Sequence, residues 1–385
     1  MRPKVLFVSH TTNFIKFNLP YMKWFRDQGW LVHYASAEEE PFPDGVCDAH
    51  FQIAFQRSPY SSDNIRAYKQ MKQLIDSQNY QIIHCHTPVG GAVTRLAAKD
   101  ARKRGTKVIY TAHGFHFYHG APKRNWILYY SIEKYLSKHT DCLITINEED
   151  YSIAHKNFHS KQIEKIDGVG VDLTAFYPIG EEEKQALRAS LGFASDDFLL
   201  IYAGELNYNK NQAVLLTAMK NIKERYPHIK LLLAGKGELE DRYQQMAKEL
   251  QIEDTVFFLG YCKQMPIIYQ ISDVGVSSSI REGLPLNLLE SMACGLPIIA
   301  SRNRGHCEIV ENGRNGLLFS LDNPSQMFYD IQVLYNDPML RQEISKNNLE
   351  DVDKFSLKRS LENMITIYNS VLYIDRLNAK EKINR

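Results

Sequence analysis

Two glutamates, Glu282 and Glu290, stand with seven residues between them in the stretch Ser277–Ser301. An apolar run ends at the serines, residues 283–285 turn the chain, and apolar residues follow at helical spacing. A strand, a glycine turn and a helix start present backbone N–H groups and the positive helix end to a phosphate. Because a phosphate repels carboxylates, the glutamates suit sugar hydroxyls better. The stretch therefore predicts a nucleotide-sugar site; the alternative is an ordinary turn with solvated glutamates.

Three more predicted strands in the second half also end in glycine-bearing loops. The strand Phe198–Ala203 leads to Lys210, where a cation would face a diphosphate at a helix start. The strands 231–234 and 256–259 end at Gly235 and Gly260. Because parallel strands end at one edge of a sheet, these loops are expected to contribute to the same site.

The first half opens with a predicted βαβ unit. It comprises a strand Lys4–Ser9, a helix Leu19–Gln28 and a strand Leu31–Ala35, which indicates a parallel sheet. The polar loop between the first two elements, His10–Asn18, should face a ligand. It lacks the paired glycines of a dinucleotide fingerprint, so a nicotinamide cofactor is not expected.

Histidines gather at two consecutive strand ends of this half. His84 and His86 follow one apolar run, before a predicted helix Ala92–Arg104, and His113 follows the next run. No Asp or Glu lies among these histidines, which favours polar recognition over a metal site. Some of them are alternatively packed core residues.

The segment 122–136 combines basic and aromatic residues. Lys123, Arg124 and Trp126 suit a membrane–water interface or a lipid-linked acceptor. The apolar residues of the same predicted helix, Ile127, Leu128 and Ile132, are expected to be buried.

Composition excludes several classes of function. Apolar content of 44% and charged content of 24% are typical of a globular protein. No apolar run approaches the roughly 20 residues that span a bilayer, and no signal peptide is expected. Six scattered cysteines argue against a zinc site or a disulfide framework and for a reducing compartment. The expected location is therefore cytoplasmic, and the basic and aromatic residues of the first half add an expected peripheral contact with the inner face of the membrane. A net charge of +1 argues against nucleic-acid binding.

That small net charge conceals an asymmetry between the halves. Residues 1–170 carry 22 Lys and Arg against 16 Asp and Glu, and the remainder carries 24 against 29. A basic first half is suited to an anionic membrane or a phosphorylated acceptor.

The predicted architecture is α/β, with two Rossmann-like, doubly wound parallel-sheet domains facing a cleft. The expected boundaries are 1–170 for an acceptor-side domain and 171–357 for a nucleotide-sugar domain. A helix at about 358–377 is expected to pack back on the first domain.

Together these residues resemble the retaining glycosyltransferases of family 4, which have the GT-B fold, over nearly the whole chain. The matching signatures of the second half are A-G-E-L-N-Y-N-K-N (203–211), A-G-K-G-E (234–238) and E-G-L-P-L-N-L-L-E-S-M-A-C-G-L-P-I-I-A-S (282–301). In the first half, 83–91, 113–122 and 144–151 resemble the subgroup that builds capsule, exopolysaccharide and O-antigen repeat units.

The resemblance implies a role for each matching residue. Lys210 would neutralise the donor diphosphate, Glu282 would bind the donor sugar, and His113 would lie near the transferred sugar. The remaining donor-binding residues are Glu290 at the ribose, Gly283 and Leu284 at the phosphates, and Gly235, Lys236 and Tyr261 around the base. The acceptor-side residues are Thr12, Asn13, His84, His86, Lys123, Arg124 and Trp126.

The chain departs from the family pattern at two positions. Glu205 stands where the family often has arginine, so Arg281, Lys236 or the helix N-terminus would have to compensate. The first loop reads His-Thr-Thr-Asn at 10–13 in place of a glycine pair.

The expected activity is transfer of a hexose or N-acetylhexosamine from a UDP-sugar to a lipid-pyrophosphate-linked saccharide, with no metal or other cofactor. The alternatives are a sugar-nucleotide epimerase and a non-catalytic nucleotide-sugar-binding partner in a polysaccharide assembly complex.

Overall fold

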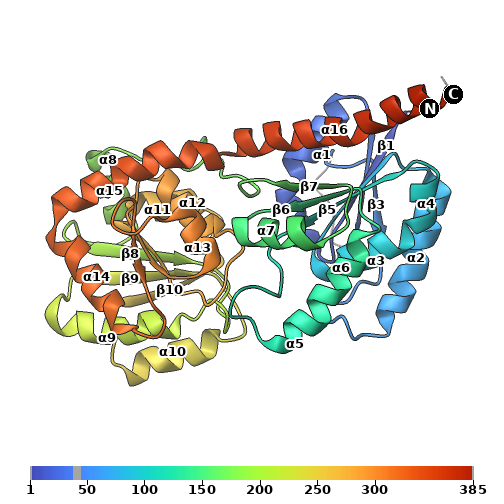
Figure 1. The fold of residues 1–385 in the computed structure, drawn as a ribbon. Helices are drawn as coiled ribbons and strands as arrows, with labels where there is room; N and C mark the ends of the chain where they lie inside the picture. The colour runs from blue at the N-terminus through green and yellow to red at the C-terminus, as the bar shows by residue number, and fades with distance from the viewer. Residues whose placement is uncertain (1, 38–44, 384–385) are drawn as a thin grey trace. The chain divides into compact units, whose positions relative to one another are not determined.

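The computed structural model describes residues 2–37 and 45–383, and the side chains of 374–383 lie outside this description. Two compact units divide the chain (Figure 1): unit 1 is Met1–Val169 with Ser360–Arg385, and unit 2 is Gly170–Arg359. No helix of the described residues is both long enough and apolar enough to cross a bilayer.

Unit 1 contains a seven-stranded sheet in the order β3-β2-β1-β4-β5-β6-β7, with every neighbouring pair parallel. Its strands are β1 Lys4–Val8, β2 Leu31–Ser36, β3 Ala49–Gln52, β4 Ile82–His86, β5 Lys107–Ala112, β6 Cys142–Thr145 and β7 Gln162–Lys165. Its helices are η1 Thr12–Phe17, α1 Leu19–Asp27, α2 Asp63–Gln78, α3 Pro88–Ala97, α4 Lys99–Lys103, α5 Lys123–Asn125, the π-helix η2 Trp126–Tyr130, α6 Ser131–Ser137 and α7 Glu148–Asn157.

Unit 2 contains a six-stranded parallel sheet in the order β10-β9-β8-β11-β12-β13. Its strands are β8 Phe198–Ala203, β9 Ile229–Ala234, β10 Val256–Gly260, β11 Val274–Ser277, β12 Ile298–Ser301 and β13 Leu317–Phe319. Its helices are α8 Glu181–Ser190, α9 Ala213–Arg225, α10 Glu240–Glu249, α11 Met265–Ile271, α12 Leu286–Ala293, α13 Arg304–Ile309, α14 Ser325–Asn336, α15 Pro338–Asp351 and η3 Val352–Phe355.

Each sheet is covered by helices on both faces, because side chains of successive strand residues point in opposite directions. In β8, Leu200 and Tyr202 belong to one buried cluster, whereas Leu199 and Ile201 belong to another. This alternation builds a core on each face of the sheet. The prediction of two doubly wound parallel sheets is thus confirmed.

The last helix, α16 Leu357–Ile383, begins in unit 2 and continues onto unit 1. Tyr368 of this helix is fully buried, stacks on Trp24 with ring centroids 5.9 Å apart, and shares a hydrogen bond of 2.7 Å with His84 Nδ1. The Oη of Tyr21 bonds Ser360 Oγ at 2.9 Å. These contacts make the C-terminal segment part of the core of unit 1.

Two local predictions for unit 1 are wrong. The helix predicted at Ala92–Arg104 begins at Pro88 and gives way to α4 after Ala97, so the glycine pair at 90–91 lies inside a helix. A Cβ at Gly91 would lie 2.5 Å from the ring of Tyr110, so glycine lets α3 approach the sheet. The loop predicted at His10–Asn18 contains the 3₁₀ helix η1.

Candidate active site

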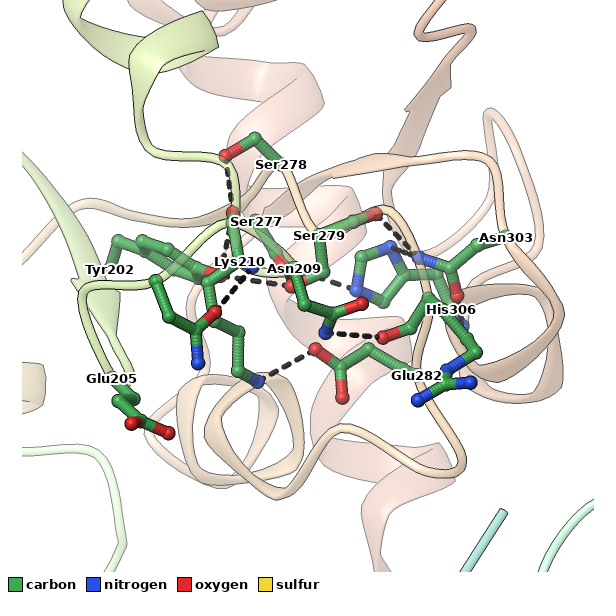
Figure 2. Close-up of polar contacts among 12 residues, drawn as sticks. Tyr202, Glu205, Asn209, Lys210, Ser277, Ser278, Ser279, Glu282, Asn303 and His306 are labelled. Carbon is green, nitrogen blue, oxygen red and sulfur yellow. Dashed lines mark hydrogen bonds and ion pairs between the residues drawn. The ribbon is translucent and has the colours of Figure 1, made fainter. Parts of the chain in front are cut away.

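The centre of the candidate site in unit 2 is an ion pair between Lys210 and Glu282 (Figure 2). Lys210 Nζ lies 2.6 Å from Glu282 Oε1, and the two side chains are 21% and 13% exposed. Burial alone would lower the pKa of Lys210, but the adjacent Glu282 carboxylate offsets this and raises it. Burial alone would raise the pKa of Glu282, yet Lys210 holds it below its usual range. Both groups are therefore charged near neutral pH.

Lys210 is positioned by the loop between β8 and α9. Its backbone N–H donates to Asn207 Oδ1 at 2.9 Å, and its carbonyl accepts from Tyr202 Oη at 3.2 Å and Ser278 Oγ at 3.1 Å. Asn209 Nδ2 donates to the carbonyl of Arg281 at 3.0 Å. These bonds tie the loop of Lys210 to the loop that carries Glu282.

Glu282 is held from the other side by the start of α13. Arg304 Nε donates to the Glu282 carbonyl at 3.3 Å. A Cβ at Gly305 would lie 2.7 Å from the Glu282 Cβ and 2.8 Å from its carbonyl carbon, so only glycine allows this close packing.

His306, in the first turn of α13, is fully buried. Its Nδ1 lies 2.5 Å from the Ser301 carbonyl, its Nε2 lies 3.1 Å from Ser277 Oγ, and its backbone N–H donates to Asn303 Oδ1. Burial lowers the pKa of His306 to about 4, although Glu282 acts to raise it. The sequence reasoning missed His306; the signal that could have found it is Asn303, an N-cap residue three positions earlier and two positions after the end of a strand.

Glu290 lies in the middle of α12, whose first residue is Leu286, one position after Pro285. Tyr269 Oη donates to Glu290 Oε2 at 2.9 Å. Burial, together with the Glu290 carboxylate, raises the pKa of Tyr269 well above its ordinary value, so the hydroxyl stays a donor. Gly283 and Leu284 lie in the turn before this helix, half-buried.

The residues predicted around the base lie on the neighbouring loops. Gly235 has φ +146°, and a Cβ there would lie 2.0 Å from the Gly204 carbonyl oxygen, which brings the loops after β8 and β9 into contact. Lys236 is exposed, and Tyr261 is 75% exposed. Glu205 is exposed on the Lys210 loop, and the half-buried Arg281 precedes Glu282.

In unit 1, the structure brings His86 and His113 together, with His86 Nδ1 3.1 Å from His113 Nε2. Phe14 packs edge-on against His113 with ring centroids 4.6 Å apart. Burial lowers the pKa of His113 to about 4, so it is neutral near pH 7. His86 Nε2 is buried and has no hydrogen-bond partner among the described residues. The pair is a candidate for binding a hydroxyl, because neutral imidazoles both donate and accept.

The structure assigns His84 to the core and not to an acceptor site. It lies within β4, fully buried, with Nδ1 bonded to Tyr368 Oη and Nε2 bonded to Thr111 Oγ1 at 2.8 Å. Thr12 is also buried, 3.1 Å from Ser36 Oγ. Both residues were predicted at the acceptor side because the sequence indicates that they lie at or after a strand end, whereas it does not indicate that they are buried. The side chain of Asn13 lies outside the described part of the chain.

In the segment 122–136, the side chains that are buried differ from those that were predicted to be buried. Ile127 and Ile132, expected in the core, are 74% and 40% exposed. Trp126 is instead half-buried and donates from Nε1 to the Tyr118 carbonyl at 3.3 Å. The wide π turn across 126–130 rotates the apolar face relative to a regular helix, which sequence spacing could not show. Lys123 and Arg124 are exposed, as an interfacial role requires.

Two residues of the 144–151 signature, Asn147 and Asp150, position the loop that follows His113. Asp150 Oδ2 accepts from the Phe115 N–H at 2.9 Å and from Asn147 Nδ2 at 3.0 Å.

Among the residues that the structure describes, no group of three His, Cys, Asp or Glu is arranged to hold a metal ion.

Comparison with known proteins connects this geometry to a family. Residues 183–351 match the family model described as "Glycosyl transferases group 1", and residues 4–147 match "Glycosyl transferase 4-like". EpsD of Bacillus subtilis (strain 168), a protein named as a glycosyltransferase, is 45% identical over an alignment of 385 residues that covers 99% of this chain and 100% of EpsD.

A second relative has a more specific name. The Escherichia coli UDP-Gal:alpha-D-GlcNAc-diphosphoundecaprenol alpha-1,3-galactosyltransferase is 30% identical over an alignment of 318 residues that covers 79% of this chain and 81% of that protein.

Solved structures share the fold. Anabaena Alr3699/HepE, in complex with UDP and glucose, superposes with a TM-score of 0.79 at 18% identity, covering 96% of this chain and 100% of that one. The lipopolysaccharide glycosyltransferase WaaG superposes with a TM-score of 0.75 at 14% identity, covering 94% and 99%. The predicted GT-B class is confirmed, and the chain belongs to the group 1, family 4-like glycosyltransferases.

Proposed function

We propose that this glycosyltransferase transfers a hexose or N-acetylhexosamine from a UDP-sugar to a hydroxyl of a lipid-pyrophosphate-linked saccharide, with retention of anomeric configuration. The observation that carries the proposal is the ion pair of Lys210 and Glu282 beside a helix start. A cation next to free backbone N–H groups suits a diphosphate, and a carboxylate next to it suits sugar hydroxyls. The named substrates of the E. coli relative support the donor and acceptor classes.

In the proposed reaction, the bond between the sugar C1 and the diphosphate oxygen breaks, and its electron pair stays on the leaving oxygen. Lys210 and the backbone N–H groups of Gly283 and Leu284 stabilise that growing charge. The acceptor hydroxyl oxygen bonds to C1, and its proton passes to the leaving phosphate. No separate base and no divalent cation are needed in this scheme.

Glu290 is assigned to the ribose hydroxyls, with Tyr269 fixing its carboxylate. The assignment of His113 to the transferred sugar stays a prediction from the family resemblance. Its low pKa is consistent with positioning by a neutral imidazole, which can donate a hydrogen bond without carrying charge.

The decisive experiment for the donor is a panel of nucleotide sugars, tested for thermal stabilisation and for slow hydrolysis. We expect a UDP-sugar to stabilise the protein and to be hydrolysed without acceptor. Stabilisation by GDP- or ADP-sugars alone would contradict the donor assignment. Tight binding of nucleotide sugars without turnover of any of them would favour a non-catalytic binding partner.

The stereochemistry and the metal independence have separate tests. Nuclear magnetic resonance of the product should show the anomeric configuration of the donor, whereas inversion would contradict the mechanism. Transfer should continue in excess chelator, and activity that a chelator abolishes and a divalent cation restores would refute the metal-free scheme. Epimerised UDP-sugar without transfer to any acceptor would point to an epimerase.

A further inference from the structure

Unit 1 contains an apolar cavity of about 650 Å³ that the proposed sugar-transfer chemistry does not use. Its volume lies in the range of pockets that bind small organic ligands. The apolar lining comes from three places: a loop before α2, the first turns of α3, and the segment of η2 and α6. The lining includes Arg57, Tyr60, Val89, Ala92, Leu128 and Ile132.

One end of this cavity lies at the carboxyl edge of the sheet. Its lining there includes His10, which follows β1, and Pro88, which begins α3 after β4. The two segments are in contact, since the His10 N–H donates to Thr87 Oγ1 at 3.1 Å. In parallel α/β sheets ligands bind at this edge, so the cavity lies where a ligand is expected.

The other end reaches surface residues that are unusually apolar for exposed positions. Tyr60 is 76% exposed and Ile132 is 40% exposed, and both line the cavity. Ile127, on the preceding turn of the same helical segment, is 74% exposed. Exposed apolar side chains that continue an apolar cavity mark a binding surface and not a folding core.

The charged side chains around the cavity favour binding of an anion next to Arg57. Glu133 lines the cavity, but both of its carboxylate oxygens are bonded to the buried Arg95, at 2.8 and 3.1 Å. Its negative charge is therefore compensated within the protein. Arg57 is exposed at the cavity and forms no ion pair with any residue in the described part of the chain. Lys123 and Arg124 add exposed cations to the helical segment.

We infer that this cavity binds the hydrocarbon chain of the lipid-pyrophosphate acceptor, with Arg57 facing the pyrophosphate. The inference rests on the proposed function, because that function supplies a lipid-linked acceptor. Besides its apolar residues the lining contains His10, Asn64 and His116, so a ligand with both an apolar and a polar part fits it better than a saccharide alone. A branched isoprenoid chain matches a lining of valine, leucine, isoleucine, proline and tyrosine.

The test uses farnesyl diphosphate as the probe and measures its binding by isothermal titration calorimetry. Inorganic pyrophosphate lacks the chain and should bind at least about tenfold more weakly, as should farnesol, which lacks the phosphates. Equal affinity for farnesyl diphosphate and pyrophosphate would overturn the inference, because the cavity would then contribute nothing.

Variants locate the binding in this cavity. Ile132→Asn should weaken farnesyl diphosphate binding about tenfold, and Ala92→Trp, which fills the cavity, should weaken it further. The matched control is Ile65→Asn, since Ile65 is 63% exposed on α2 and does not line the cavity. Arg57→Gln should weaken farnesyl diphosphate but not farnesol. Unchanged affinity in both cavity variants would overturn the inference, and circular dichroism checks that each variant is folded.

Titration of UDP on the same proteins separates this inference from the proposed function. UDP binding together with no cavity-dependent binding of farnesyl diphosphate would overturn the cavity assignment and leave the sugar-transfer proposal standing. Cavity-dependent binding of the probe in a protein that binds no nucleotide sugar would instead support the cavity and contradict the proposed function.

Discussion

Replacing Lys210 with methionine should reduce both stability and activity, and the two losses have different causes. The substitution leaves the Glu282 carboxylate without the ammonium that lies 2.6 Å away. Removing one partner of a fully buried ion pair costs about 3–5 kcal/mol. Because these side chains are 21% and 13% exposed, water recovers part of this cost, and we expect about 2–3 kcal/mol.

Activity should fall through the loss of charge stabilisation on the leaving phosphate. Removal of one such donor costs about 3–4 kcal/mol of barrier, which is about a 10²–10³-fold decrease in kcat. The double variant Lys210→Met, Glu282→Gln separates the two effects. A neutral amide needs no ammonium beside it, so the stability of the double variant should recover while its activity stays low.

Urea unfolding followed by circular dichroism measures the stability, and release of UDP from the donor measures the activity. Lys220→Met is the matched control, since Lys220 is exposed on α9 and should change neither quantity. Turnover of the single Lys210 variant at the unmodified rate would refute the phosphate assignment. Recovery of activity in the double variant would refute the separation of the two roles.

Three further results are expected. Tyr269→Phe removes the hydrogen bond to Glu290 and should raise the donor KM about 2–10-fold with little change in kcat, as initial rates would show; an unchanged KM would argue against Glu290 at the donor. Gly305→Ala places a Cβ against Glu282 and should lower kcat at least about tenfold in a folded protein; full activity would mean that the loop shifts freely. Because burial lowers the folded-state pKa of His306 to about 4, the unfolded state binds its proton first as pH falls. Stability should therefore decrease from about pH 6.5 towards pH 4, and a urea midpoint constant over that range would contradict the buried neutral form.

The strands at the centre of each sheet could be predicted from sequence because they are buried on both faces. β8 is a continuous apolar run that ends before Gly204, and β11 carries Val274 and Val276 before a run of serines. The edge strands β3 and β7 escaped prediction, since Ala49–Gln52 and Gln162–Lys165 carry polar residues and are only partly buried. An edge strand is held by backbone hydrogen bonds to one neighbouring strand, and this pairing leaves little pattern in its side chains.

At the candidate site, the sequence predicted the charged residues as members of the site, but it did not predict which residues they contact or how deeply they are buried. Lys210 and Glu282 were predicted as separate ligand contacts, whereas the structure pairs them directly. The distance between residues so far apart in sequence depends on how β8 and β11 pair, which no local pattern encodes. Burial is equally non-local, and for that reason His84 was misassigned and His306 was overlooked.

The pairing of Lys210 with Glu282 has a consequence for how a donor would bind. Each group is held at its place by neighbouring loops, Lys210 through Asn207 and Glu282 through the start of α13. A donor that takes a phosphate to the ammonium and a hydroxyl to the carboxylate replaces one ion pair by two charge-assisted bonds without moving either loop. Such a site keeps its dipoles oriented before the reaction begins, which is the condition for stabilising a transition state at little reorganisation cost. With Glu205 in place of a second cation, Lys210 and the turn at 283–285 would carry this stabilisation together.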